Sequence, residues 1–92
     1  MITITLDFTK DVRIVVAHAR QSSTVVLPRN TISEEFVDTN RLLSAIRDAL
    51  ADAGIIADDL RMDDLYHDLL SEGEIARGLR REIAISEHYF DE

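Results

Sequence analysis

Apolar and polar side chains alternate strictly over residues 2–8, with apolar residues at the even positions and polar residues at the odd ones. This period of two is typical of a β-strand that buries one face. Two further segments rich in β-branched residues follow at 12–19 and 24–27, and Pro28 ends the second of them. Short polar segments separate the three runs. The pattern predicts a three-stranded antiparallel meander over residues 1–28.

Beyond Pro28 the apolar residues recur every three or four positions, as in a helix that packs one side against a core. This spacing predicts a helix over residues 39–53, and Gly54 follows it at a position where glycine commonly ends helices. A second helix is expected after Asp58 or Asp59, either of which can cap its first amides. Its predicted buried face carries Met62, Leu65, Tyr66 and Leu69.

A third helix is predicted from Glu74 onward, with an apolar side made of Ile75, Leu79, Ile83 and Phe90. Because only Ser71, Glu72 and Gly73 interrupt the pattern before it, the second and third helices are expected to pack antiparallel. The whole pattern therefore predicts a single α+β domain over residues 1–92. In it, the small sheet of residues 1–28 packs against about three helices of an acidic part, residues 31–92.

Composition narrows the class of protein. The chain has 92 residues, of which 46% are hydrophobic and 30% charged, as expected for one small globular domain. It has no cysteine, so disulfides and thiolate metal sites are excluded. The first residues lack the pattern of a signal peptide, and no apolar run reaches the roughly 18–20 residues that span a bilayer. We therefore expect a soluble cytoplasmic protein that makes no membrane contact.

Charge is distributed unevenly along the chain. Residues 1–31 contain four bases and two acids, a net charge of +2, whereas residues 32–92 contain six arginines and sixteen acids, a net charge of −10. Seven of these acids lie within residues 58–74, where Arg61 is the single base. A segment with this charge repels nucleic acid and attracts basic surfaces.

The acids of the second predicted helix permit two interpretations. They can form a solvated face that is compensated by Arg77, Arg80 and Arg81 on the neighbouring third helix, each ion pair contributing about 0–1 kcal/mol. They can also form a docking surface for a basic partner, because three arginines cannot neutralise seven acids. The docking interpretation assigns partner binding to Asp58, Asp59, Asp63, Asp64, Asp68 and Glu72.

Two apolar features do not fit the expected core. Ile85 and Tyr89 lie four residues apart, away from the apolar side of the third helix, and Val15, Ala17 and Ala19 make the outer sheet face apolar. Such residues belong either to a bent C-terminal segment and a covered sheet face, or to an interface with a partner or a second copy. On the second interpretation, Ile85 and Tyr89 are candidate apolar interface residues.

The sequence offers little support for catalysis or for a cofactor. Asp63 and Asp64 lie four and three residues before His67, a spacing that metal sites use, but no second cluster repeats it. The three glycines form neither a phosphate-binding loop nor a nucleophile elbow. Direct DNA binding is disfavoured by the net charge of −8. The bases at Lys10, Arg13, Arg20 and Arg29 are expected to protect strand edges and turns rather than to contact RNA.

In size, acidity, lack of cysteine and lack of catalytic motifs, the chain resembles the small inhibitors encoded by phages and other mobile elements. Anti-CRISPR and anti-restriction proteins are examples, and some of them present acids in place of nucleic-acid phosphates. The resemblance concerns overall character, and it implies a non-enzymatic inhibitor that docks on a basic, nucleic-acid-handling protein or ribonucleoprotein. A structural or regulatory module that forms homo-oligomers is the alternative.

Overall fold

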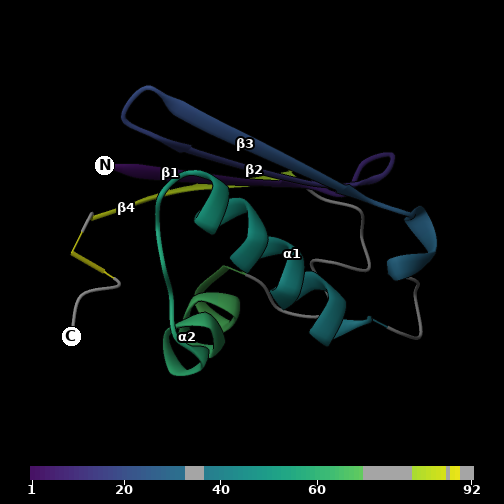
Figure 1. Cartoon of the computed structure of the whole chain (residues 1–92). Coiled ribbons are helices and arrows are strands. Elements are labelled where there is room, and N and C mark those ends of the chain that lie inside the picture. The colour runs from purple at the N-terminus through teal and green to yellow at the C-terminus, as the bar shows by residue number, and fades with distance from the viewer. Residues whose placement is uncertain (33–36, 70–79, 87, 90–92) are drawn as a thin grey trace.

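Four antiparallel strands form one sheet, and two helices cover one of its faces (Figure 1). The computed structural model describes residues 1–32, 37–69, 80–86 and 88–89. The sheet has the strand order β3-β2-β1-β4. In chain order the elements are β1 (Ile2–Asp7), β2 (Val12–His18), β3 (Gln21–Leu27), a 3₁₀ turn η1 (Arg29–Thr31), α1 (Thr39–Asp52), α2 (Asp59–Leu69) and β4 (Arg80–Ile85).

The predicted meander of three strands is confirmed in its topology, with β1 paired to β2 and β2 paired to β3. The third strand is longer than expected, because it begins at Gln21 rather than at Thr24. The preceding turn is formed by Ala19 and Arg20, between the paired residues His18 and Gln21. Ala19 makes this tight turn possible by adopting a positive φ of 56°. The residues predicted to form the turn, 21–23, therefore extend the strand.

The core lies between the sheet and the helices. Each of the first three strands turns alternate residues toward the helices, and those of β1 and β2 are almost completely buried: Ile2, Ile4, Leu6, Val12, Ile14 and Val16 are at most 1% exposed. Helix α1 meets them with Leu42, Ile46 and Leu50, and α2 with Met62 and Leu65. The predicted inward faces of β1, β2 and α1 are confirmed, and that of α2 is confirmed for Met62, Leu65 and Tyr66, whereas the Leu69 side chain lies outside the described residues.

Helix α1 begins where the sequence predicts and ends one residue earlier, and both of its ends are capped. The Asp38 carboxylate accepts a hydrogen bond from the Arg41 amide at the N-terminal end. At the C-terminal end the amides of Gly54 and Ile55 donate to the carbonyls of Ala51 and Leu50, which is the Schellman arrangement. Gly54 has a φ of +86°, which only glycine adopts readily.

The predicted third helix is wrong over residues 80–85, which form the fourth strand instead. This strand pairs antiparallel with β1, so that Ile83 lies opposite Ile4 and Ile85 lies opposite Ile2. The described residues therefore contain four strands and two helices, rather than three strands and about three helices. Ile83 and Ile85 are compatible with a strand because they alternate with Glu82 and Ala84. The edge of β1 provides the backbone partner for this strand. Residues 74–79 and Phe90 of that prediction lie outside the described residues.

Candidate protein-docking surface on α2

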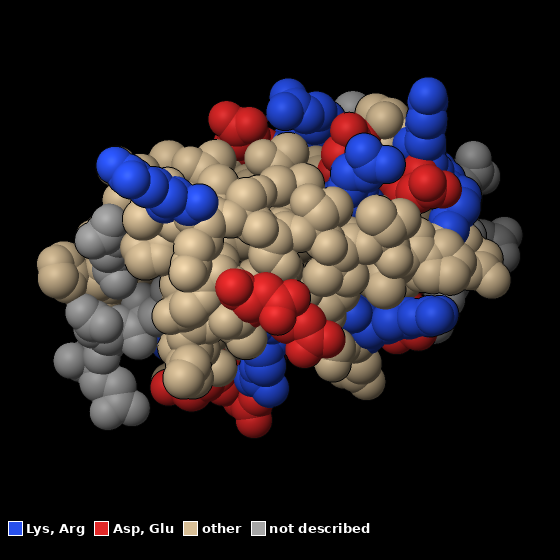
Figure 2. Space-filling view, turned by 45° about the horizontal axis from the view of Figure 1, so that its top comes forward, with Lys and Arg blue, Asp and Glu red and all other residues tan. Residues whose placement is uncertain are grey.

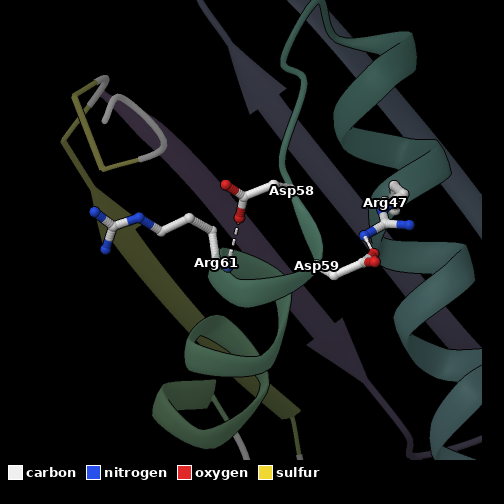
Figure 3. A network of polar contacts seen from close by, with 4 residues as sticks. All are labelled: Arg47, Asp58, Asp59 and Arg61. Carbon is white, nitrogen blue, oxygen red and sulfur yellow. Dashed lines mark hydrogen bonds and ion pairs between the residues drawn. The ribbon is translucent and has the colours of Figure 1, made fainter.

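The acidic helix α2 begins where the sequence places its cap. Asp58 accepts a hydrogen bond of 2.8 Å from the Arg61 amide, and its own carbonyl accepts one from Met62 (Figure 3). The cap provides acceptors for amides that the helix itself leaves without partners. The carboxylate of Asp58 thus has a structural role, and its exposed position also leaves it near the start of the acidic surface.

The solvent side of α2 carries two rows of acids. With 3.6 residues per turn, Asp59 and Asp63 lie on the side toward α1, whereas Asp64 and Asp68 lie on the opposite flank. Leu60 lies between the two rows, on the side of the helix opposite the buried Met62 and Leu65, and it is 71% exposed. All four acids are exposed. We call Leu60 and these four acids the α2 surface.

Two arginines compensate part of this charge. Arg47 of α1 forms an ion pair with Asp59, as Figure 3 shows, and the Asp59 side chain remains 91% exposed. Arg61 lies 4.0 Å from Asp64, one helical turn away. Ion pairs as exposed as these contribute little to stability. The side chain of Asp63 makes no hydrogen bond or ion pair with the described residues.

The arginines that the sequence placed beside the acidic helix are not arranged as expected. Arg80 and Arg81 belong to β4, and Arg80 forms an ion pair of 3.5 Å with Glu82 of the same strand. Because Arg80 is the cross-strand partner of Asp7, it lies on the sheet face that points away from the helices. Arg77 and Glu72 lie outside the described residues. The predicted helical hairpin does not form over residues 80–85, and Arg47 and Arg61 are described residues that contact acids of α2.

A shallow groove of about 370 Å³ separates α1 from α2. Its apolar wall consists of Leu43 and Met62, and its polar rim includes Arg47, Asp59 and Asp63. Asn40 and Ser44 of α1 complete the lining. The groove thus places a carboxylate row beside an apolar strip, an arrangement that accommodates the stem and the charged end of a long basic side chain.

Ile85 and Tyr89 have a different environment from the one expected for an exposed interface. Both side chains are half-buried and pack against the hydrophobic core of the chain itself. The Tyr89 hydroxyl donates a hydrogen bond of 2.9 Å to Asp68. Ile85 did not fit the apolar side of the predicted helix, which suggested an interface. The strand explains this position, because Ile85 faces the core from β4, beside Ile2. Asp68, in turn, connects α2 to the segment that follows β4.

Sequence reasoning missed the two exposed apolar residues next to the acids. Ile56 is 90% exposed in the segment that leads into α2, and Leu60 follows it within the first turn of the helix. For Leu60 a signal was available, because a helical projection places it opposite Met62 and Leu65. Ile56 gave no comparable signal, since a short apolar connector such as Ile55 to Ala57 does not reveal which of its residues is buried.

Two further properties of the described residues bear on chemistry. No three His, Asp or Glu side chains among them lie close enough together to hold a metal ion. Within the same ranges, neither helix has the length and the apolar character needed to cross a membrane.

Comparison of the chain with protein-family models, with curated protein sequences and with solved structures gives no match. A function for the α2 surface must therefore be inferred from its geometry and charge.

The contact between Tyr89 and Asp68 can be tested by titrating the Tyr89 phenol. Burial of the phenol, supported by the hydrogen bond to Asp68, raises the pKa of Tyr89 from 10.0 to about 12. Because the folded chain holds this proton more tightly than the unfolded chain, the contact stabilises the fold fully below pH 10, and this contribution is lost as the pH rises from 10.0 to about 12. Tyrosinate absorbance, measured as the difference between the parent and Tyr89→Phe, should show this high pKa. The Asp68→Asn variant should titrate closer to 10.0; an unchanged curve would contradict the contact.

Proposed function

We propose that the chain is a non-enzymatic binding protein that docks its α2 surface on a basic protein surface. The observation that carries the proposal is the exposed Leu60 between two rows of exposed acids. A single exposed leucine is ordinary on a protein surface, but Leu60 and Ile56 are both strongly exposed beside the acids and together offer the apolar contact area that an interface uses. Asp58, Asp59, Asp63, Asp64 and Asp68 are the partner-binding acids of this proposal, together with Glu72 of the sequence prediction.

Leucine and the acids have different roles in such a contact. Leu60 and Ile56 supply apolar area that leaves water on binding, and this area sets most of the affinity. The acids orient the encounter and accelerate it, and they exclude acidic partners. Asp63 is well placed for a new ion pair, because no described residue already engages it. The groove beside it can accept a lysine or arginine stem against Leu43 and Met62.

The partner class we favour is a protein or ribonucleoprotein that handles nucleic acid. Such proteins carry basic surfaces, which attract a chain of net charge −8. Successive acids within one row of α2 are four residues apart, or about 6 Å along the helix axis. Duplex DNA carries one charge per about 1.7 Å, so α2 imitates its charge only in part. Blocking a basic groove, in the manner of an anti-CRISPR or anti-restriction inhibitor, therefore depends on shape around Leu60 as well as on charge.

A capture experiment with matched variants tests the proposal. The chain is immobilised and exposed to a cell lysate, and bound proteins are eluted with salt rising from about 0.1 M to about 1 M, over which the Debye length falls from about 10 Å to about 3 Å. Proteins that elute are identified, and duplex DNA and RNA are tested as competitors for rebinding. We expect a basic nucleic-acid-binding protein that is displaced by either competitor.

The variants separate specific docking from general charge. Asp63→Asn with Asp64→Asn should lower the partner affinity at least about tenfold, or about 1.4 kcal/mol. Asp11→Asn with Asp48→Asn removes the same charge from exposed positions outside α2 and should bind as the parent does. Leu60→Ala should weaken binding with no loss of fold. The proposal is wrong if both double variants and Leu60→Ala retain the parent affinity.

A further inference from the structure

The sheet has a second face, on which no helix of the described structure packs (Figure 1). We call it the outer face. Its residues follow from the strand registers, and most of them are small or uncharged. They are Thr3, Thr5 and Asp7 of β1, Arg13, Val15 and Ala17 of β2, Ser22, Thr24 and Val26 of β3, and Arg80, Glu82 and Ala84 of β4.

Charge on the outer face is confined to one end and to one corner. Arg13, Asp7 and Arg80 form a row across three strands, because Asp7 is the cross-strand partner of both arginines. Glu82 lies in the next row, where it accepts a hydrogen bond of 3.2 Å from Thr5. Hydrogen bonds from the Thr9 side chain and amide, together with the two arginines, lower the pKa of Asp7, which therefore remains a carboxylate.

The outer face is thus electrically balanced in a strongly acidic molecule. Its two arginines and two acids cancel, whereas the whole chain has a net charge of −8. Figure 2, turned by 45° so that the sheet side comes forward, shows uncharged surface with most charged side chains toward its margins and one acidic cluster near the centre of the view. Two copies of an acidic protein repel each other least when they meet through a face of zero net charge.

The outer face is also complementary to itself. We propose that two copies of the chain stack through their outer faces, about a twofold axis that runs parallel to the strands between β1 and β2. This axis exchanges β1 with β2, so Arg13 of each copy meets the carboxylate of Asp7 of the other. Val15 then faces Thr5, and Ala17 faces Thr3. An axis perpendicular to the strands would instead place Arg13, Asp7 and Arg80 against Ala17, Thr3 and Ala84, with no ion pair.

Small side chains and sheet geometry support this arrangement. Stacked sheets pack about 10 Å apart and within about 30° of alignment, and the pairs next to the axis stay in register under such a rotation. Val26, at the margin, is 51% exposed in the single chain. Four strands about 4.8 Å apart and six residues long give a face of about 19 by 20 Å. This area is below that of a standard interface, so the dimer is a weak and reversible one.

A pair of charge variants tests the dimer directly. In Arg13→Asp, carboxylates would face carboxylates across the axis, and in Asp7→Arg, guanidinium groups would face guanidinium groups. Each variant alone should therefore self-associate at least about tenfold more weakly than the parent in sedimentation equilibrium. When the two are mixed, every new charge meets its opposite, and the mixed dimer should form with an affinity close to that of the parent. A docking that does not bring Arg13 of one copy against Asp7 of the other does not predict this rescue.

Further variants keep the test decisive. Asp7→Arg also removes the hydrogen bonds to Thr9, so circular dichroism must show that it folds. Should it not fold, Val15→Glu places a carboxylate beside the axis, and Ala51→Glu is its matched control on an exposed turn of α1. Loss of dimerisation in Val15→Glu, together with unchanged dimerisation in Ala51→Glu, supports an interface on the outer face. A parent that stays monomeric at millimolar concentration, or single variants that associate like the parent, would overturn the proposal.

The dimer and the proposed docking function fail independently. The double change Asp63→Asn with Asp64→Asn lies on the helical side of the molecule, so it should leave self-association unchanged. Variants of the outer face should likewise leave partner capture through α2 unchanged. Pairing of two copies along the β3 edge is the competing arrangement, and it would be recognised by self-association that is insensitive to both Arg13→Asp and Asp7→Arg.

Discussion

Replacing Leu65 by alanine is expected to destabilise the folded chain by about 2–5 kcal/mol, which is a large part of the stability of a domain this small. Leu65 is fully buried, and it fixes α2 to the core that Leu42 and Ile46 of α1 also line. Its removal would leave a cavity that the surrounding side chains fill only in part. Chemical denaturation, followed by circular dichroism, measures the effect.

Leu60→Ala is the matched control for this prediction. It makes the same change in the same helix, at a side chain that is 71% exposed, so the free energy of unfolding should change by less than about 0.5 kcal/mol. The two leucines thus separate stability from binding: Leu65→Ala should lower stability, and Leu60→Ala should lower partner affinity. Equal effects on stability would show that α2 is not oriented as described.

The second large effect is expected at Ile4. This residue is fully buried in β1, between Val16 of β2 and Ile83 of β4. Ile4→Ala should lower the free energy of unfolding by about 2–5 kcal/mol. Thr5→Ala, on the opposite face of the same strand, serves as the control and should lower the free energy of unfolding by less than about 1 kcal/mol. The comparison measures how strongly the central strand depends on its inward face.

A double-mutant cycle extends this test to the pairing of β1 with β4. Because Ile4 and Ile83 are direct cross-strand neighbours, the combined change to alanine should depart from the sum of the single changes by at least about 0.5 kcal/mol. Residues in separate elements that do not touch would show additive effects. Additivity here would contradict the strand register of β4.

Most of the fold could be read from local patterns. The alternation at 2–8 and the apolar spacing at 39–53 each occur in a single element that buries one side, and each is confirmed with boundary shifts of one residue. The cap of α2 was predictable to within one residue, Asp58 or Asp59, because aspartate is a preferred N-cap residue, and the structure selects Asp58. These features depend on neighbours in sequence, which is why the sequence reveals them.

Residues 80–85 could not be assigned in the same way. Ile83 continues a spacing of four from Ile75 and Leu79, which favours a helix, but it also alternates with Ile85, which favours a strand. The choice is made by β1, whose open edge lies far away in sequence and needs a partner for its backbone groups. A pairing over such a separation leaves no local signal.

The candidate site was predictable in its acids but not in its contacts. The α2 acids are a property of composition and spacing, and the structure places all of the described ones on the solvent side. The hydrogen bond between Tyr89 and Asp68, by contrast, joins residues 21 positions apart and depends on the path of the chain after β4. For the same reason, the partner of Asp59 is Arg47 of α1 and not an arginine of the predicted third helix.

The position of β1 in the sheet has a consequence for how the protein is made. β1 occupies an interior place in the sheet, and one of its two neighbours is β4, which follows it in the chain only after β2, β3 and both helices. Until β4 is in place, Ile2, Ile4 and Leu6 belong to an unfinished sheet with an open edge, the kind of intermediate that chaperones recognise and that aggregates readily. The sheet therefore cannot be completed until β4 has been synthesised and has paired with β1.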